Sequence, residues 1–132
     1  MADRLRSCPV SVGYLFGSEA KGSPGPLSDI DIAILVNKGL AKPERFDLRL
    51  RLSNELSSIM GRRVDVVVLN DAPVQLSFEI IKYGEVLLCS DRFVRVDFEH
   101  GVLSRYLDRR YYDKRYAETT LRRISRTGLQ AG

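Results

Sequence analysis

A glycine-serine turn followed by two closely spaced aspartates is the part of this sequence best suited to chemistry. Gly17 and Ser18 follow an apolar run, and glycine there lets backbone N–H groups approach an anion such as a phosphate. Lys21 could add a positive charge to the same site. Asp29 and Asp31 occupy alternate positions, so in a strand they share a face with alpha carbons about 7 Å apart. These residues predict binding of a metal ion and a nucleotide phosphate.

Each of these features also has a plainer explanation. A glycine-serine pair is usually only a turn, and an exposed lysine such as Lys21 is usually just solvated. Asp29 and Asp31 could lie at a frayed strand end and face water, although aspartate is depleted from strands. Taken singly, none of these residues identifies a site.

A third aspartate, Asp65, lies in the apolar run of residues 64–69. A buried carboxylate requires a partner or a cation, and Arg62 or Arg63 could instead form a local ion pair with it. Three aspartates at the ends of neighbouring strands, beside a glycine-serine turn, are harder to explain separately. The combination favours magnesium-nucleotide chemistry, in which two Mg²⁺ ions about 3.5 to 4 Å apart hold the reacting oxygens of a phosphoryl displacement.

Strands and helices alternate along the chain, as its hydrophobic periodicity indicates. The expected strands are residues 10–16, 29–36 and 64–69, with a short edge strand at 85–89. The expected helices are residues 43–60, 74–83 and a long last helix from near residue 91 that frays towards 125. Pro43 suits the first turn of the first of these helices and Gly61 its C-terminal cap. The helical residues expected to face the core are Leu48, Leu52, Leu56, Ile59, Met60, Leu76, Ile80, Ile81, Val94, Phe98, Val102, Leu103, Tyr106 and Leu107.

These elements predict an α+β fold, a small mixed β-sheet with helices packed mainly on one face. The 132 residues suit one compact domain, which we place at residues 1–126 including the last helix, with 127–132 as a loose tail. Apolar residues make up 44% and charged residues 29%, which is ordinary for a folded cytoplasmic protein and unlike a disordered one. No apolar run reaches the roughly 18 residues of a membrane-spanning helix.

Positive charge is concentrated at the C-terminal end of the chain. The net charge is +4, yet residues 104–132 carry eight basic against three acidic side chains. Tyrosines lie among them, so this segment could bind nucleic acid through phosphate contacts and base stacking. A helical face for solvent or a protein partner is the favoured interpretation, because no recognised nucleic-acid motif accompanies the charge.

The spaced motif resembles the minimal nucleotidyltransferases of the DNA polymerase beta-like superfamily. The resemblance rests on Gly17-Ser18, ten intervening residues, Asp29-Ile30-Asp31 and a later strand aspartate, Asp65. It extends to the segments 14–18, 63–67 and 78–84 and covers roughly residues 10–106. Two features depart from the family pattern: lysine stands at position 21, where many relatives have arginine, and only about nine residues precede the first strand.

The resemblance implies a nucleotidyltransferase fold and transfer of AMP from ATP to a hydroxyl. By analogy, Gly17, Ser18 and Lys21 would bind the triphosphate, Asp29 and Asp31 would ligate two Mg²⁺ ions, and Asp65 would hold the catalytic one. Small members of this family are often the antitoxins of HEPN/MNT toxin–antitoxin pairs. The implied partner is therefore an HEPN-domain toxin, and the implied acceptor is one of its tyrosines.

Two other functions stay open. The chain could be a noncatalytic antitoxin-type protein that binds its partner through the basic C-terminal helix. It could also modify a small molecule such as an antibiotic, acting as a homo-oligomer. A noncatalytic protein would still protect its partner without ATP and without Asp29 and Asp31. Activity on an aminoglycoside with no protein acceptor present would favour small-molecule modification.

Overall fold

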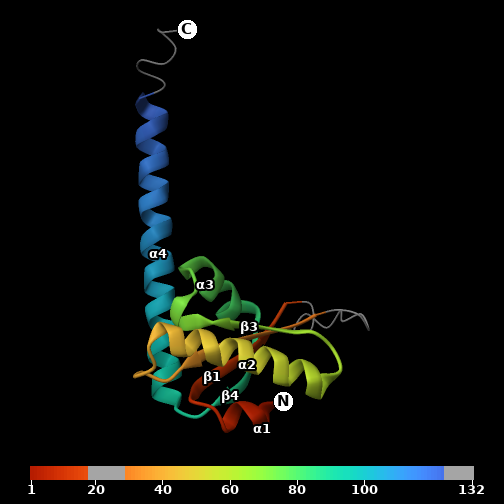
Figure 1. The fold of residues 1–132 in the computed structure, drawn as a ribbon. Helices are drawn as coiled ribbons and strands as arrows, with labels where there is room; N and C mark the ends of the chain where they lie inside the picture. The colour runs from red at the N-terminus through yellow and green to blue at the C-terminus, as the bar shows by residue number, and fades with distance from the viewer. Residues whose placement is uncertain (18–28, 124–132) are drawn as a thin grey trace.

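A four-stranded mixed sheet carries the helices of this protein (Figure 1). The computed structural model describes residues 1–17 and 29–123, and for residues 112, 113, 116 and 118–123 the backbone only. The elements in chain order are α1 (Ala2–Arg6), β1 (Val10–Phe16), β2 (Ile30–Val36), α2 (Lys42–Met60), β3 (Val64–Val68), the 3-10 turn η1 (Leu69–Asp71), α3 (Val74–Tyr83), β4 (Glu85–Cys89) and α4 (Arg92–Arg123).

The strands lie in the order β3-β2-β1-β4. β2 pairs parallel with β3, whereas β1 runs antiparallel to both β2 and β4. The parallel pair is possible because α2 returns the chain across the sheet between β2 and β3. The predicted mixed sheet and the edge position of residues 85–89 are confirmed. The sequence did not predict α1, whose Leu5 is fully buried.

Both faces of the sheet are covered, where the sequence predicted helices mainly on one. One face packs Ile30, Ile32 and Ile34 against the leucines of α2. The other packs Ala33 and Leu35 with residues of α3 and α4. Alternate residues of a strand point to opposite faces, so a strand apolar at nearly every position is buried on both.

The helices bury narrower stripes than their sequences suggested. In α2 the buried residues are Leu48, Leu52 and Leu56, and the predicted core residues Ile59 and Met60 are exposed. In α4 Val102 is fully buried, whereas the predicted core residues Val94, Leu103 and Leu107 are exposed. Neighbouring positions on a helix differ by about 100° in direction, so an apolar residue next to the packed stripe turns away from the core.

α4 is attached to the sheet through a buried tyrosine. Tyr14 of β1 is 1% exposed, and its hydroxyl donates a hydrogen bond of 2.8 Å to the Glu99 carboxylate of α4. Arg95, one turn earlier, donates to the same carboxylate oxygen at 3.0 Å. Burial, followed by the Glu99 carboxylate, raises the pKa of the Tyr14 hydroxyl, which therefore stays protonated as a donor at neutral pH. Beyond this contact α4 extends well away from the sheet (Figure 1).

Tyr14→Phe should lower the free energy of unfolding by about 1 to 2 kcal/mol, because it removes a buried hydrogen bond to a charged acceptor and leaves the ring in place. Urea denaturation measures the change. Tyr83→Phe, at a tyrosine that is 61% exposed, is the matched control and should be neutral. Equal stabilities for both variants would show that the bond to Glu99 does not hold α4.

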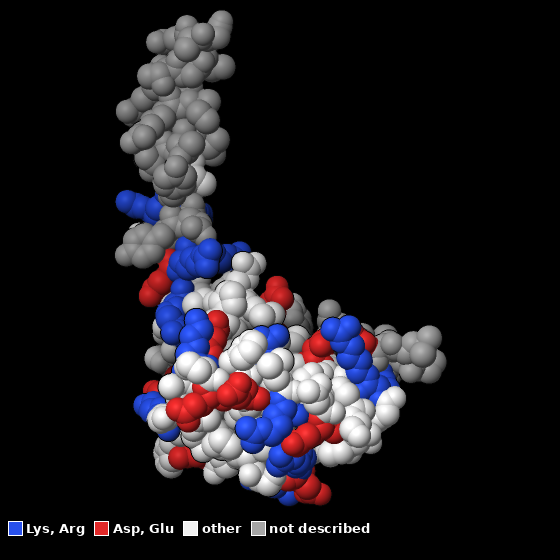
Figure 2. Space-filling view, in the orientation of Figure 1, with Lys and Arg blue, Asp and Glu red and all other residues white. Residues whose placement is uncertain are grey.

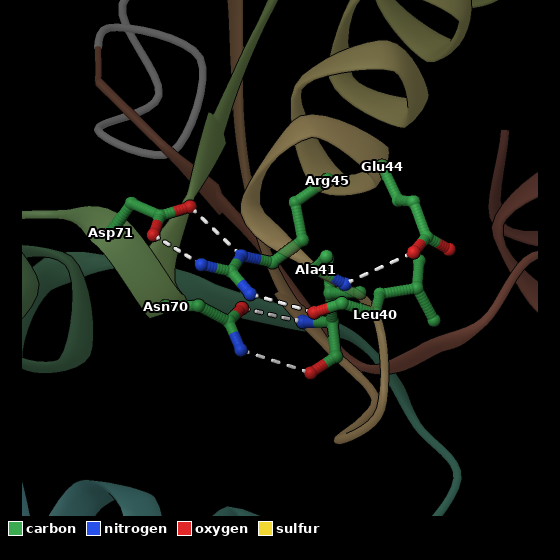
Figure 3. A network of polar contacts seen from close by, with 7 residues as sticks. Leu40, Ala41, Glu44, Arg45, Asn70 and Asp71 are labelled. Carbon is green, nitrogen blue, oxygen red and sulfur yellow. Dashed lines mark hydrogen bonds and ion pairs between the residues drawn. The ribbon is translucent and has the colours of Figure 1, made fainter.

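A polar network secures the far end of β2 (Figure 3). The Asn70 side chain accepts from the backbone N–H of Val36 at 2.8 Å and donates to the Val36 carbonyl at 3.0 Å. Arg45 of α2 donates to both Asp71 oxygens, at 3.0 and 2.7 Å, and to the Leu40 carbonyl at 2.8 Å. These bonds tie η1 to β2 and α2, and so hold β2 and β3 in one register.

The described part of the chain includes no helix with the length and apolar character of a membrane span.

Candidate active site

The strand register brings two of the predicted aspartates side by side. Asp31 in β2 is the direct partner of Asp65 in the parallel strand β3. On its other side Asp31 is the partner of Phe16, the last residue of β1. Asp29 lies just before β2 and is exposed. Asp31 is therefore the central residue of the site, with a strand on each side.

Gly17 follows β1 directly and faces Asp31. Its φ of +78° lies in the left-handed region, which favours glycine. A Cβ atom placed on Gly17 would overlap the Asp31 carboxylate oxygen and would lie 3.2 Å from its Cγ. The backbone conformation favours glycine, and a larger residue would also displace the Asp31 side chain, so Gly17 packs directly on the central carboxylate.

The environment of Asp31 opposes its negative charge. Burial, then the charge of Asp65, then that of Asp29 raise the pKa of the Asp31 carboxyl above its ordinary value. Like charges at close range disfavour ionisation, and a cation would relieve that cost. Because ionised Asp31 is destabilised without a cation, binding of a cation at this position is favoured.

Asp65 is partly neutralised by a neighbour. Arg63 Nε lies 3.4 Å from Asp65 Oδ1, which confirms the local ion pair considered from the sequence. The side chains are 73% and 43% exposed, so water screens the pair and it contributes little to stability. A cation or substrate can therefore displace Arg63 at small cost.

The aspartates fit a metal held jointly with a nucleotide. Among residues 1–17 and 29–123, no three acidic, histidine or cysteine side chains are arranged as a ready metal site. Asp31 is nevertheless close enough to Asp29 and Asp65 for both to affect its pKa. Mg²⁺ prefers oxygen ligands and is usually held by one or two carboxylates, waters and substrate phosphates, so a complete protein cage is not required.

A small cavity of about 130 Å³ adjoins the same turn. It is lined by Phe16, Gly17, Leu76, Glu79, Ile80 and Tyr83. This pocket brings residues of α3 beside Gly17, the residue that contacts the Asp31 carboxylate. Sequence reasoning gave Glu79 and Tyr83 no role. Periodicity places residues 76, 80 and 83 on one face of α3, but their position beside Gly17 follows only from the packing of α3 on the sheet.

The remaining predicted site residues, Ser18 and Lys21, lie outside the described residues. The structure thus brings Gly17, Asp31 and Asp65 together and places Asp29 just before β2, exposed to solvent.

Comparison with known proteins identifies similar sequences. A family model described as Polymerase beta, Nucleotidyltransferase matches residues 6–93, which include all three aspartates. The chain is 36% identical over 74 residues to the protein adenylyltransferase MntA of Shewanella oneidensis. That match covers 56% of this chain and 50% of MntA, so the chain matches about half the length of this curated relative.

Solved structures share the fold. A chain in a crystal structure of a toxin–antitoxin with AMP-PNP has a TM-score of 0.72 and 26% identity, covering 90% of this chain and 94% of that one. A chain in the complex of the tri-AMPylated Shewanella oneidensis HEPN toxin with the MNT antitoxin has a TM-score of 0.64 and 21% identity, covering 91% and 95%. These likenesses confirm the predicted nucleotidyltransferase fold.

Proposed function

Because the chain belongs to the Polymerase beta nucleotidyltransferase family, we propose that it transfers AMP from ATP to a hydroxyl of a protein. The observation that carries the proposal is the position of Asp31, next to Asp65 in register and in direct contact with the Gly17 turn. This arrangement places carboxylates beside a turn that a phosphate can approach closely.

We assign each residue a role in that transfer. Gly17, Ser18 and Lys21 bind the triphosphate of ATP. Asp29, Asp31 and Asp65 hold Mg²⁺, which when bound offsets the charge of the phosphates. Asp65, freed from Arg63, accepts the proton of the acceptor hydroxyl. The hydroxyl oxygen then forms a bond to the alpha phosphorus, and the bond to the leaving pyrophosphate breaks.

We further propose that the acceptor is a tyrosine of an HEPN-domain toxin, which gives this protein an antitoxin role in the cytoplasm. Two findings support this choice: the relative from Shewanella oneidensis is a protein adenylyltransferase, and a similar solved chain lies in a complex with a tri-AMPylated HEPN toxin.

The proposal is tested with purified protein, an HEPN-domain partner protein, Mg²⁺ and ATP labelled at the alpha phosphate. The partner should become labelled, whereas ATP labelled at the gamma phosphate should leave no label and EDTA should prevent transfer. Mass spectrometry should place AMP on a tyrosine. Asp65→Asn should reduce the rate by about 10²- to 10³-fold. Absence of label on any partner under these conditions would contradict the proposal.

A noncatalytic binding role is the second candidate, and the exposed apolar and basic surface of α4 favours it. A protein of that kind would suppress its partner equally well without ATP and with Asp65→Asn. Loss of suppression in both conditions would exclude it.

A further inference from the structure

α4 exposes a row of apolar residues at the spacing of a coiled coil. Phe93, Val96, Leu103 and Leu107 are 88%, 54%, 45% and 54% exposed. With His100 between them, successive positions are separated by three or four residues in strict alternation. This is the heptad pattern by which one helix packs along another. We call these five residues the α4 seam.

The seam borders a groove that is already formed. A cavity of about 410 Å³ lies between α3 and α4. Phe78, Ile81 and Lys82 line it from α3, while Val96, His100 and Leu103 of the seam line it from α4. The adjacent face of α4 is used within the protein, because Tyr106 stacks on Phe78 with ring centroids 3.8 Å apart and Val102, which also lines the groove, is buried. Three seam residues thus form one wall of the groove, and the exposed residues Phe93 and Leu107 extend the apolar row beyond it.

Basic side chains gather where α4 leaves the domain (Figure 2). Arg105, Arg109, Arg110 and Lys114 are exposed there. Continuing the heptad from Leu107, the next seam positions are occupied by Arg110 and Lys114. The surface thus changes along its length from apolar to positively charged.

We propose that the α4 seam and the adjoining groove dock an amphipathic, acidic helix of a protein partner. The heptad spacing matches a helix, whereas nucleic acid has no need of an apolar row. The basic end calls for acidic side chains. A second copy of this chain packed in parallel would place the basic residues Arg110 and Lys114 against the same basic residues of its partner, and this like-charge repulsion disfavours it. The length of α4, 32 residues of which the distal part extends beyond the domain, is consistent with a helix stabilised by packing against a partner.

This inference rests on the proposed function only in taking the partner to be a protein. The two are tested separately, because docking on α4 requires neither ATP nor the aspartates. Asp31→Asn should leave docking unchanged, and loss of docking should leave the ATP site intact.

The test uses fluorescent designed peptides of about three heptads, with Leu at positions a and d and Glu at e and g. Fluorescence anisotropy without nucleotide should show saturable binding that weakens as salt is raised. A matched peptide with Lys at e and g should bind at least about tenfold more weakly. Leu107→Glu should weaken binding of the acidic peptide about tenfold or more, since a buried leucine contributes about 1.5 to 3 kcal/mol.

The matched control is Ile59→Glu, an equivalent change at an α2 residue that is 58% exposed, and it should bind like the wild type. Circular dichroism of both variants establishes that they fold. Equal binding of the two peptides, no binding, or equal effects of the two variants would overturn the proposal. So would single-stranded RNA that binds more tightly than the acidic peptide, or a homodimer in sedimentation that Leu107→Glu dissociates.

Discussion

Asp31→Asn should greatly reduce the rate of nucleotidyl transfer and at the same time raise the melting temperature of the protein. The carboxylate is opposed by burial and by the charges of Asp65 and Asp29, so its negative charge destabilises the folded state without a cation. Asparagine has nearly the same shape and removes that charge. We expect activity to fall by about 10²- to 10³-fold or more. We expect Tm without Mg²⁺ to rise by about 1 to 4 °C.

The pH dependence gives an independent check on this cause. Because the folded-state pKa of Asp31 is raised, the folded protein binds the proton more tightly than the unfolded chain does. The wild type therefore gains stability from this group as pH falls through the folded pKa. The Tm advantage of Asp31→Asn should be greatest at neutral pH and shrink in that acidic range. Scanning calorimetry across pH measures it.

The matched control is Asp47→Asn, which removes an exposed carboxylate of α2. It alters the net charge by the same amount and should leave activity and the pH profile unchanged. A lower Tm for Asp31→Asn than for the wild type would show that the Asp31 carboxylate stabilises the fold, which contradicts a destabilising effect of its charge.

The proximity of Asp31 and Asp65 was partly predictable from the sequence, because both lie near the start of predicted neighbouring strands. Strand periodicity predicted one shared face for Asp29 and Asp31, and the predicted neighbouring strand carried Asp65 near its start. The structure places Asp31 in β2 beside Asp65 and Asp29 just before that strand. The sequence offered Arg62 or Arg63 as an ion-pair partner of Asp65, and the structure pairs Arg63 with it. Pairing order and register, which make Asp31 central, depend on contacts between distant segments and have no local signal.

What the sequence did not predict depends on tertiary packing. Leu103 and Leu107 look like core residues by composition, yet their direction relative to Val102 turns them outward. Glu79 and Tyr83 belong to a helix that was predicted correctly, but their place beside Gly17 depends on how α3 packs on the sheet. Hydrophobic periodicity identifies the apolar side of a helix or strand, but it does not identify which other element packs against that side.

Gly17→Ala should also reduce nucleotidyl transfer, because it disturbs the contact between Gly17 and the Asp31 carboxylate. Alanine at position 17 would be strained at the φ of +78°, which residues other than glycine rarely adopt. Its Cβ would also overlap the Asp31 carboxylate, so either the turn or the carboxylate must move. We expect a loss of about 1 to 3 kcal/mol in the free energy of unfolding, and a loss of transfer activity comparable to that of Asp31→Asn. Urea denaturation and the labelled-ATP assay measure the two effects.

Gly61→Ala separates backbone strain from the clash with Asp31. Gly61 has a φ of +65°, yet nothing lies within 4 Å of a Cβ placed there, so this variant bears the conformational cost alone. The excess destabilisation of Gly17→Ala over Gly61→Ala then measures the contact with Asp31. Removing the carboxylate should remove that excess: in the Asp31→Ala background, Gly17→Ala should cost no more than Gly61→Ala does in the wild type. A full penalty in that background would mean that the Gly17 turn is constrained by something other than Asp31, and that the turn and the carboxylate do not act as one unit.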